Sequence, residues 1–260
     1  MKKTKQKLDY TILIVTLGLL VCGLGMLYSA STVESYKNFG NTHYYFVQQL
    51  QGAALGLIAL YICSKIDYHI WQKLLPVIVV SSLILLMLVK VPGLGFSSGG
   101  ATRWINLGPI FFQPAELAKI AVIFYTAGWI SKKAPKGRDF YFGWLPALLI
   151  VALFAVLILW QPDLGTMLIL VATAMAMFFA GGMLLKYFAG LGLIGSLAIL
   201  VLIKLEPYRA SRLTIFLNPS ADPLGFGYQI NQALIAIGSG GLFGYGYGLS
   251  RQKYNYLPEA

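Results

Sequence analysis

Long apolar runs constrain this 260-residue chain more than any other feature of its sequence. Each run is close to 20 residues, the length at which an α-helix crosses the hydrocarbon core of a bilayer. About seven runs of this kind are present, at residues 10–30, 45–64, 72–90, 112–130, 143–160, 164–182 and 187–204. The sequence therefore predicts an all-α polytopic membrane protein with a transmembrane bundle over residues 1–204.

The composition excludes a soluble enzyme. Hydrophobic residues make up 58% of the chain and charged residues only 11%, whereas a soluble domain carries roughly 25% charged residues. The net charge of +11 does not indicate nucleic-acid binding, because the basic residues form short clusters between apolar runs. The first run, from Tyr10 to Ala30, is too long for a signal peptide and is followed by further spans, so it is a membrane anchor.

The basic residues also predict the orientation of the bundle. With a cytoplasmic N-terminus, the inner segments hold eleven Lys and Arg residues and the short outer segments hold three. This excess follows the positive-inside rule. Residues 205–260 then form a large extracytoplasmic loop, in which residues 227–237 have helical periodicity but are too short to span the membrane.

Polar residues within or beside the spans are the candidates for function, because each is costly in a membrane. In residues 99–121, Gln113 followed by Pro114 signals the start of a helix. Glu116 and Lys119 are three residues apart on that helix, so they share a face. They form either a structural ion pair or a site in which Lys119 faces a hydrated cavity that holds an anion.

A second Gln-Pro pair occurs at residues 161–162 and predicts another helix start, with Asp163 in the first turn. Both helices run from outside to inside in the predicted topology. Glu116 and Asp163 therefore lie at the same membrane face, where two helix N-termini offer N–H groups to an anion.

The outer loop holds two further candidates. Arg209 and Arg212 share a face if their segment is helical, and they form either an interfacial basic pair or contacts with the phosphates of a lipid-linked substrate. Gln229 and Gln232 lie three apart on the polar side of the short predicted helix.

Several segments together resemble the SEDS family of bacterial cell-wall polymerases, the group that contains FtsW, RodA and SpoVE. They are GATRWINLG, QPAELAK, QPDLGT, PYRASRL, LNPSADPLGFGYQINQALIAIGSGG and GYGLSRQKYNYLPEA, and they cover the chain from about residue 99 to its end. The first apolar run is also similar to the family's first helix. The RWINLG and YLPEA segments are more similar to FtsW and SpoVE than to RodA.

This resemblance implies a peptidoglycan glycosyltransferase of about ten helices that polymerises lipid II at the outer membrane face, in cell division or related wall synthesis. It implies a cognate class B penicillin-binding protein (a transpeptidase) and other division proteins as partners. By motif match, the residues that line the family's central cavity are Arg103, Trp104, Glu116, Lys119 and Asp163. The outer-loop motifs of the family include Gln229, Gln232 and Glu259.

The catalytic base is expected outside this sequence. Family members continue after the LPEA segment with a His-Thr-Asp-Phe motif, whose Asp activates the acceptor hydroxyl, and this sequence ends at Ala260. We therefore expect the 260 residues to be an inactive, C-terminally truncated piece of a longer protein.

The residues agree with this chemistry. Glycosyl transfer requires a base for the attacking hydroxyl and positive charge for the departing pyrophosphate.

Two alternatives stay open, namely a lipid II flippase or transporter and a non-catalytic division scaffold. A flippase would carry polar groups into the cytoplasmic half of the bundle, whereas the candidate residues gather at one face. The sequence indicates no metal site or cofactor and leaves a divalent cation open.

Overall fold

The computed structural model describes residues 9–98, 101–106, 108, 111–133, 140–205, 207–219, 222–223, 225, 227–241, 244–250 and 253. The chain forms two compact units. One comprises Ile66–Ile199, and the other comprises Met1–Lys65 together with Leu200–Ala260.

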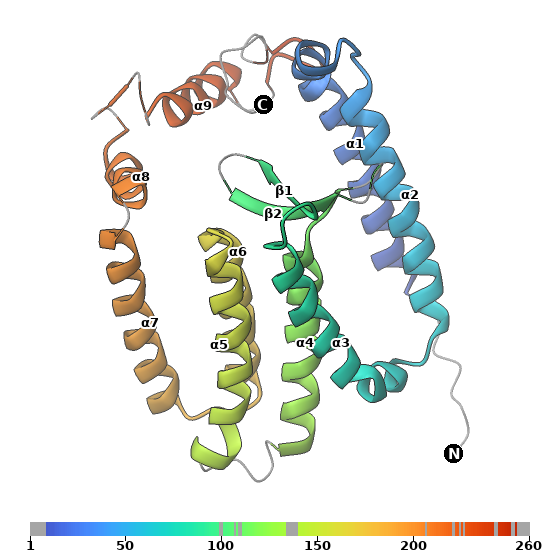
Figure 1. The fold of residues 1–260 in the computed structure, drawn as a ribbon. Coiled ribbons are helices and arrows are strands. Elements are labelled where there is room, and N and C mark those ends of the chain that lie inside the picture. The colour runs from blue at the N-terminus through green and yellow to red at the C-terminus, as the bar shows by residue number, and fades with distance from the viewer. Residues whose placement is uncertain are drawn as a thin grey trace. The chain divides into compact units, whose positions relative to one another are not determined.

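Each predicted span overlaps one helix in Figure 1: α1 (Tyr10–Phe39), α2 (Tyr44–Lys65), α3 (Tyr68–Leu88), α4 (Pro114–Lys133), α5 (Leu145–Trp160), α6 (Leu164–Ala180) and α7 (Leu185–Leu205). A short π-helix, η2 (Phe140–Trp144), precedes α5. Five described helices are long and apolar enough to cross a membrane, namely α1, α2, α3, α5 together with η2, and α7. The apolar helix α6 is shorter. The predicted α-helical membrane fold is thus confirmed, with one addition, a small β-sheet.

Helices α3 to α6 pack against one another in the Ile66–Ile199 unit. One face of α4 carries small residues, and Ala115, Ala118 and Ala121 on that face are completely buried. Small side chains let neighbouring helix backbones approach closely, which is how membrane helices pack without a hydrophobic driving force. The polar candidates on α4 are thereby held on a tightly packed helix.

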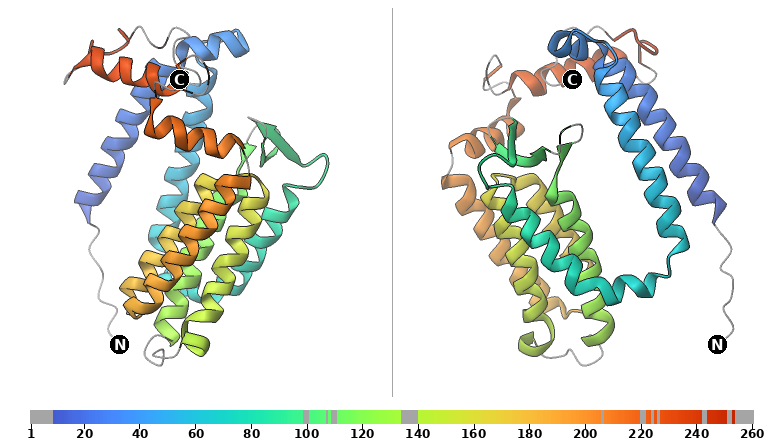
Figure 2. Two further views of the ribbon diagram at one scale, coloured as in Figure 1. Left: turned by 90° about the vertical axis from the view of Figure 1, so that its left-hand side faces the viewer. Right: turned by 45° about the vertical axis from the view of Figure 1, so that its right-hand side comes forward.

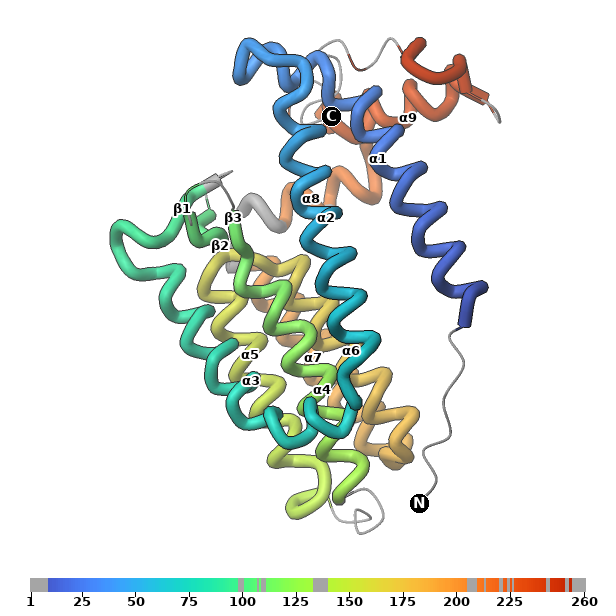
Figure 3. The backbone as a smooth tube through the Cα atoms, turned by 90° about the vertical axis from the view of Figure 1, so that its right-hand side faces the viewer, coloured from blue at the N-terminus to red at the C-terminus, as the bar shows by residue number. Residues whose placement is uncertain are grey.

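A three-stranded antiparallel sheet precedes α4. Its strands β1 (Gly95–Ser98), β2 (Ala101–Asn106) and β3 (Phe111–Phe112) lie in chain order, with an irregularity between Phe96 and Ser97. Figures 1 and 3 show the sheet at the end of the bundle where α4 begins. Ala101 and Ile105 of β2 are buried, so the sheet is anchored on the bundle by its central strand.

The sheet is predicted to need a glycine at position 95, where there is no space for a side chain. A Cβ atom at Gly95 would lie 2.1 Å from the backbone oxygen of Val89 and 2.7 Å from Cγ2 of Thr102. The Gly95→Ala variant should therefore destabilise the sheet by about 1–3 kcal/mol, seen as faster hydrogen exchange of the β2 amides. Gly56→Ala is the control, because a Cβ atom at Gly56 meets nothing within 4 Å. Unchanged exchange in Gly95→Ala would contradict the close approach.

The other unit contains the α1–α2 hairpin, in which the two helices lie side by side (Figure 2). It also contains α8 (Pro207–Leu217) and α9 (Tyr228–Gly240). Helix α9 confirms the short helix predicted over residues 227–237. The segment after α9 contacts α1, since the Tyr247 hydroxyl donates to the Gly25 carbonyl oxygen at 2.8 Å.

Candidate functional site

Asp163 is the N-cap residue of α6. One oxygen of its carboxylate accepts a hydrogen bond from the backbone N–H of Thr166 (3.1 Å), and the other accepts one from the Thr166 hydroxyl (2.8 Å). The prediction that Gln161 and Pro162 open this helix, with Asp163 in its first turn, is wrong. Gln161 is instead the C-cap of α5, and Asp163 stands just before the first helical residue because its short carboxylate can satisfy orphan N–H groups there.

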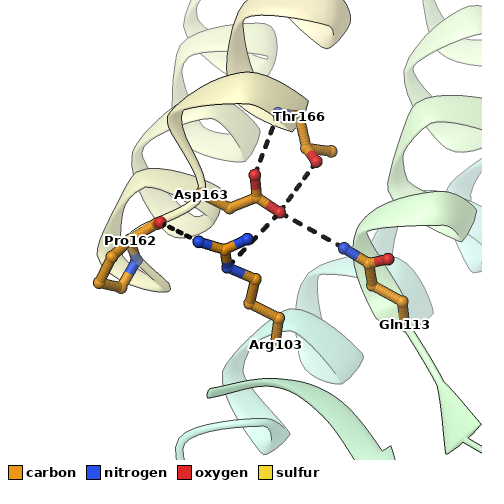
Figure 4. Close-up of polar contacts among 5 residues, drawn as sticks. All are labelled: Arg103, Gln113, Pro162, Asp163 and Thr166. Carbon is orange, nitrogen blue, oxygen red and sulfur yellow. Dashed lines mark hydrogen bonds and ion pairs between the residues drawn. The ribbon is translucent and has the colours of Figure 1, made fainter. Parts of the chain in front are cut away.

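Arg103 reaches the start of α6 from strand β2. Its Nη2 atom donates to the Pro162 carbonyl oxygen at 2.7 Å, and its Nε atom lies 3.9 Å from Oδ2 of Asp163 (Figure 4). The Asp163 side chain is only 8% exposed, whereas that of Arg103 is 35% exposed. The guanidinium therefore compensates a buried carboxylate while part of the arginine stays accessible.

Gln113 brings the start of α4 to the same carboxylate. Its amide Nε2 donates a long hydrogen bond of 3.4 Å to Oδ2 of Asp163. This contact joins residues that are 50 positions apart in the chain. Figure 4 shows the side chains of Gln113 and Arg103 pointing toward Asp163. The prediction that the two helix starts lie at the same end of the bundle is confirmed. We call Arg103, Gln113, Asp163 and Thr166 the carboxylate cluster.

Gln161 connects α5 to α3 beneath this cluster. It is completely buried, and its Nε2 atom donates to the Leu86 carbonyl oxygen near the end of α3 at 2.9 Å. Because that carbonyl belongs to the last turn of a helix, it has no partner within the helix. Gln161 thus fixes the relative height of α3 and α5 below the carboxylate cluster.

Gln161→Leu is expected to destabilise the bundle, because it leaves the buried Leu86 carbonyl unsatisfied at a cost of about 1–3 kcal/mol. Thermal unfolding of the protein in detergent measures this loss. Gln49→Leu, at an exposed position of α2, is the matched control. An unchanged unfolding temperature in Gln161→Leu would show that the Leu86 contact contributes nothing.

Glu116 and Lys119 form an ion pair on α4. Nζ of Lys119 lies 2.9 Å from Oε1 of Glu116. The Glu116 side chain is 59% exposed, and that of Lys119 is 28% exposed. The pairing predicted from their spacing is present. It is compatible with both roles predicted for Lys119, the structural ion pair and the anion site.

Trp104 is half-buried on β2, opposite Phe96 of β1.

The remaining predicted residues belong to the other unit. Arg209 and Arg212 both lie on α8, so the helical spacing expected for them is present. Arg212 is exposed, and the side chain of Arg209 lies outside the described part of the chain. Gln229 is exposed and Gln232 half-buried on α9, and Glu259 lies outside the described residues.

Sequence reasoning missed Thr166, Gln161 and the bonding role of Gln113. The spacing of Asp163 and Thr166 is a signal for the first of them, since an N-cap carboxylate bonds to residues two or three positions further on. Among the residues that the structure describes, no three His, Cys, Asp or Glu side chains are grouped so that they could hold a metal ion.

Comparison with known proteins decides the family. The model of the family that groups FtsW, RodA and SpoVE, described as "Cell cycle protein", matches residues 10–260. The chain belongs to this family. Among its FtsW/RodA/SpoVE relatives, stage V sporulation protein E of Bacillus subtilis (strain 168) is 42% identical over 258 residues, which are 99% of this chain and 70% of the relative. The probable peptidoglycan glycosyltransferase FtsW of Geobacter sp. (strain M18) is 39% identical over 252 residues, which are 97% of this chain and 69% of that protein.

A solved structure agrees with this assignment. It comes from work on the structural coordination of polymerization and crosslinking by a peptidoglycan synthase complex. The two chains superpose with a TM-score of 0.63 at 31% sequence identity, over 87% of this chain and 66% of the other. The resemblance predicted from the sequence motifs is thus confirmed, and the chain spans about two thirds of the length of the proteins it matches.

Proposed function

We propose that the full-length protein is a peptidoglycan glycosyltransferase that polymerises lipid II at the outer face of the cytoplasmic membrane. Its setting is cell division or related wall synthesis. The proposal is supported by membership of a family in which the relatives are named probable peptidoglycan glycosyltransferases. Among the residues, the proposal rests on the carboxylate cluster, in which the Arg103 guanidinium and the Asp163 carboxylate lie together where α4 and α6 begin.

In this proposal the cluster orients positive groups and does not supply the base. The Asp163 carboxylate already accepts two hydrogen bonds from Thr166 and is almost completely buried, so it is poorly placed to take a proton from a sugar hydroxyl. Its role is to hold the Arg103 guanidinium. That group and Lys119 then face the pyrophosphate that leaves as the glycosidic bond forms, and they stabilise its developing negative charge.

The base and the partner complete the proposal. The attacking hydroxyl transfers its proton to an Asp of the family motif that follows the LPEA segment. A class B penicillin-binding protein crosslinks the new strands, and the similarity to a synthase complex that couples polymerization and crosslinking supports this partnership. The N-terminus is cytoplasmic and residues 205–260 are extracytoplasmic, and Arg209 and Arg212 supply further positive charge to the lipid-linked phosphates.

The test is elongation of labelled lipid II by the full-length protein in liposomes with its transpeptidase partner. We expect glycan chains that lengthen with time and require both proteins. Absence of polymer together with partner-dependent scrambling of lipid II would identify a flippase instead. Absence of both activities, with normal binding of the partner, would identify a scaffold.

A further inference from the structure

The hairpin between α1 and α2 ends in a cluster of exposed aromatic rings. The Phe39 ring is stacked on that of Tyr44, with centroids 3.8 Å apart and planes at 16°, and it meets the Tyr45 ring edge-on at 5.5 Å. Tyr36 lies one helical turn before Phe39, so it shares the same face of α1. Tyr36 and Phe39 are 64% and 49% exposed. We call Tyr36, Phe39, Tyr44 and Tyr45 the aromatic tip.

The turn that carries these rings is closed by specific hydrogen bonds. Gly40, with a φ of 66°, caps α1 in the left-handed conformation and donates its N–H to the Tyr36 carbonyl at 2.8 Å. The buried Ser35 hydroxyl donates to the Asn41 carbonyl at 2.5 Å and accepts the N–H of Tyr44 at 3.1 Å. The hairpin itself therefore holds the rings in place. Binding of a ligand to them costs little conformational entropy, because the rings are already ordered.

Polar side chains border the rings. Nδ2 of Asn38 donates to Oε1 of Glu34 at 2.9 Å and to the Tyr45 hydroxyl oxygen at 3.3 Å. Gln48 and Gln49 follow the rings on the first turns of α2. Tyrosine hydroxyls and amide side chains both donate and accept hydrogen bonds. The tip thus combines flat apolar faces with a rim of amide, hydroxyl and carboxylate groups, and Lys37 lies on the same turn of α1.

The length of α1 places Tyr36 and Phe39 beyond the end of the hydrocarbon core. Residues 10–33 contain no charged side chain, and at about 1.5 Å per residue they are long enough to cross a core of about 30 Å. Glu34 and Lys37 then bring charge onto the helix, followed by Asn38. Aromatic rings that anchor a protein lie at the level of the lipid headgroups, so labelling of these rings from solvent is the measurement that separates an anchor from a binding surface.

Together these features fit a sugar. The C–H face of a pyranose ring carries slight positive charge and stacks on the negative face of an aromatic ring, while its hydroxyl and acetamido groups need donors and acceptors at the rim. We propose that the aromatic tip is a stacking platform for the N-acetylhexosamine rings of a β-1,4-linked glycan strand. This inference rests on the proposed function, because the predicted topology puts the tip on the side where that strand grows.

Hydroxyl-radical footprinting of the chain in lipid nanodiscs tests the proposal, with a tetramer of β-1,4-linked N-acetylglucosamine as the probe. Without probe, Tyr36, Phe39 and Tyr44 should be labelled from solvent. At a probe concentration equal to its Kd, half of the tips are occupied and labelling should fall about twofold. An equal mass of sorbitol controls for radical scavenging, and Tyr68, an exposed ring at the start of α3 and outside the predicted spans, should be labelled equally with and without the probe.

Phe39→Leu keeps an apolar side chain but removes the central ring, so it should weaken binding of the probe roughly 2- to 10-fold, and at the same probe concentration the occupied fraction should fall from one half to between about one third and one tenth. Tyr36→Phe keeps the ring and should retain protection. Rings that are unlabelled in nanodiscs lie in lipid, and that outcome would overturn the proposal. Labelled rings that the tetramer does not protect would overturn it as well. Neither readout depends on lipid II polymerisation, so failure here leaves the proposed enzyme activity untouched.

Discussion

Arg103→Ala is expected to lower lipid II polymerisation by the full-length protein about 100-fold or more, which is the loss seen when a group that stabilises transition-state charge is removed. The amount of protein in the membrane should stay normal. Asp163 keeps its hydrogen bonds from Thr166 and Gln113 in this variant, so its buried carboxylate still has partners when the guanidinium is removed. Polymer length on gels, with immunoblots of the membrane fraction, measures both quantities.

Two further variants separate the roles of Arg103. Arg103→Lys keeps the charge but loses the planar fork that reaches Pro162 and Asp163 together, so it should retain a small part of the activity. Arg103→Ala combined with Asp163→Asn removes both charges and preserves the cap on α6. If Arg103 served only to neutralise Asp163, this double variant would recover activity. We expect no recovery, because the positive charge toward the pyrophosphate is still missing.

The helices and the charged pairs were accessible to sequence reasoning because they depend on local spacing. Twenty apolar residues in a row predict a membrane helix, and Pro114 at the first position of α4 marks its start. Glu116 and Lys119 are neighbours on any helix that contains both. The predicted span begins at residue 164, as α6 does, but the sequence wrongly predicts Gln161 and Pro162 as its opening residues, because they repeat the Gln-Pro pattern of α4 while occupying the turn after α5.

The contacts that assemble the carboxylate cluster were not accessible, because they depend on how the helices are packed. The bond from Gln113 to Asp163 joins residues 50 positions apart, and that from Arg103 to the Pro162 carbonyl beside Asp163 joins residues 59 apart. The sheet was also missed. Its strands are short, and the buried positions Ala101 and Ile105 of β2 are four residues apart, a spacing that a helix face also shows.

Lys119→Ala should abolish polymerisation while Glu116→Ala should be nearly silent. Removal of a cation that faces the departing pyrophosphate is expected to cost roughly 10²- to 10³-fold in rate. The Glu116 side chain is mostly exposed, and an exposed pair three residues apart on a helix contributes only about 0.2–0.5 kcal/mol. Elongation of labelled lipid II by the full-length variants, at matched membrane abundance, measures the difference.

The exchanged variant, with Glu116→Lys and Lys119→Glu together, distinguishes a required pair from a required position. It keeps an ion pair on the same face of α4 but moves the positive charge nearly one turn toward the start of the helix, about 4.5 Å along the axis. A purely structural pair would tolerate the exchange, and both single variants would then reduce protein abundance equally. We expect the exchanged protein to be abundant and inactive, because the proposed role of Lys119 requires its charge at that depth below the start of α4, where the side chain is three-quarters shielded from solvent.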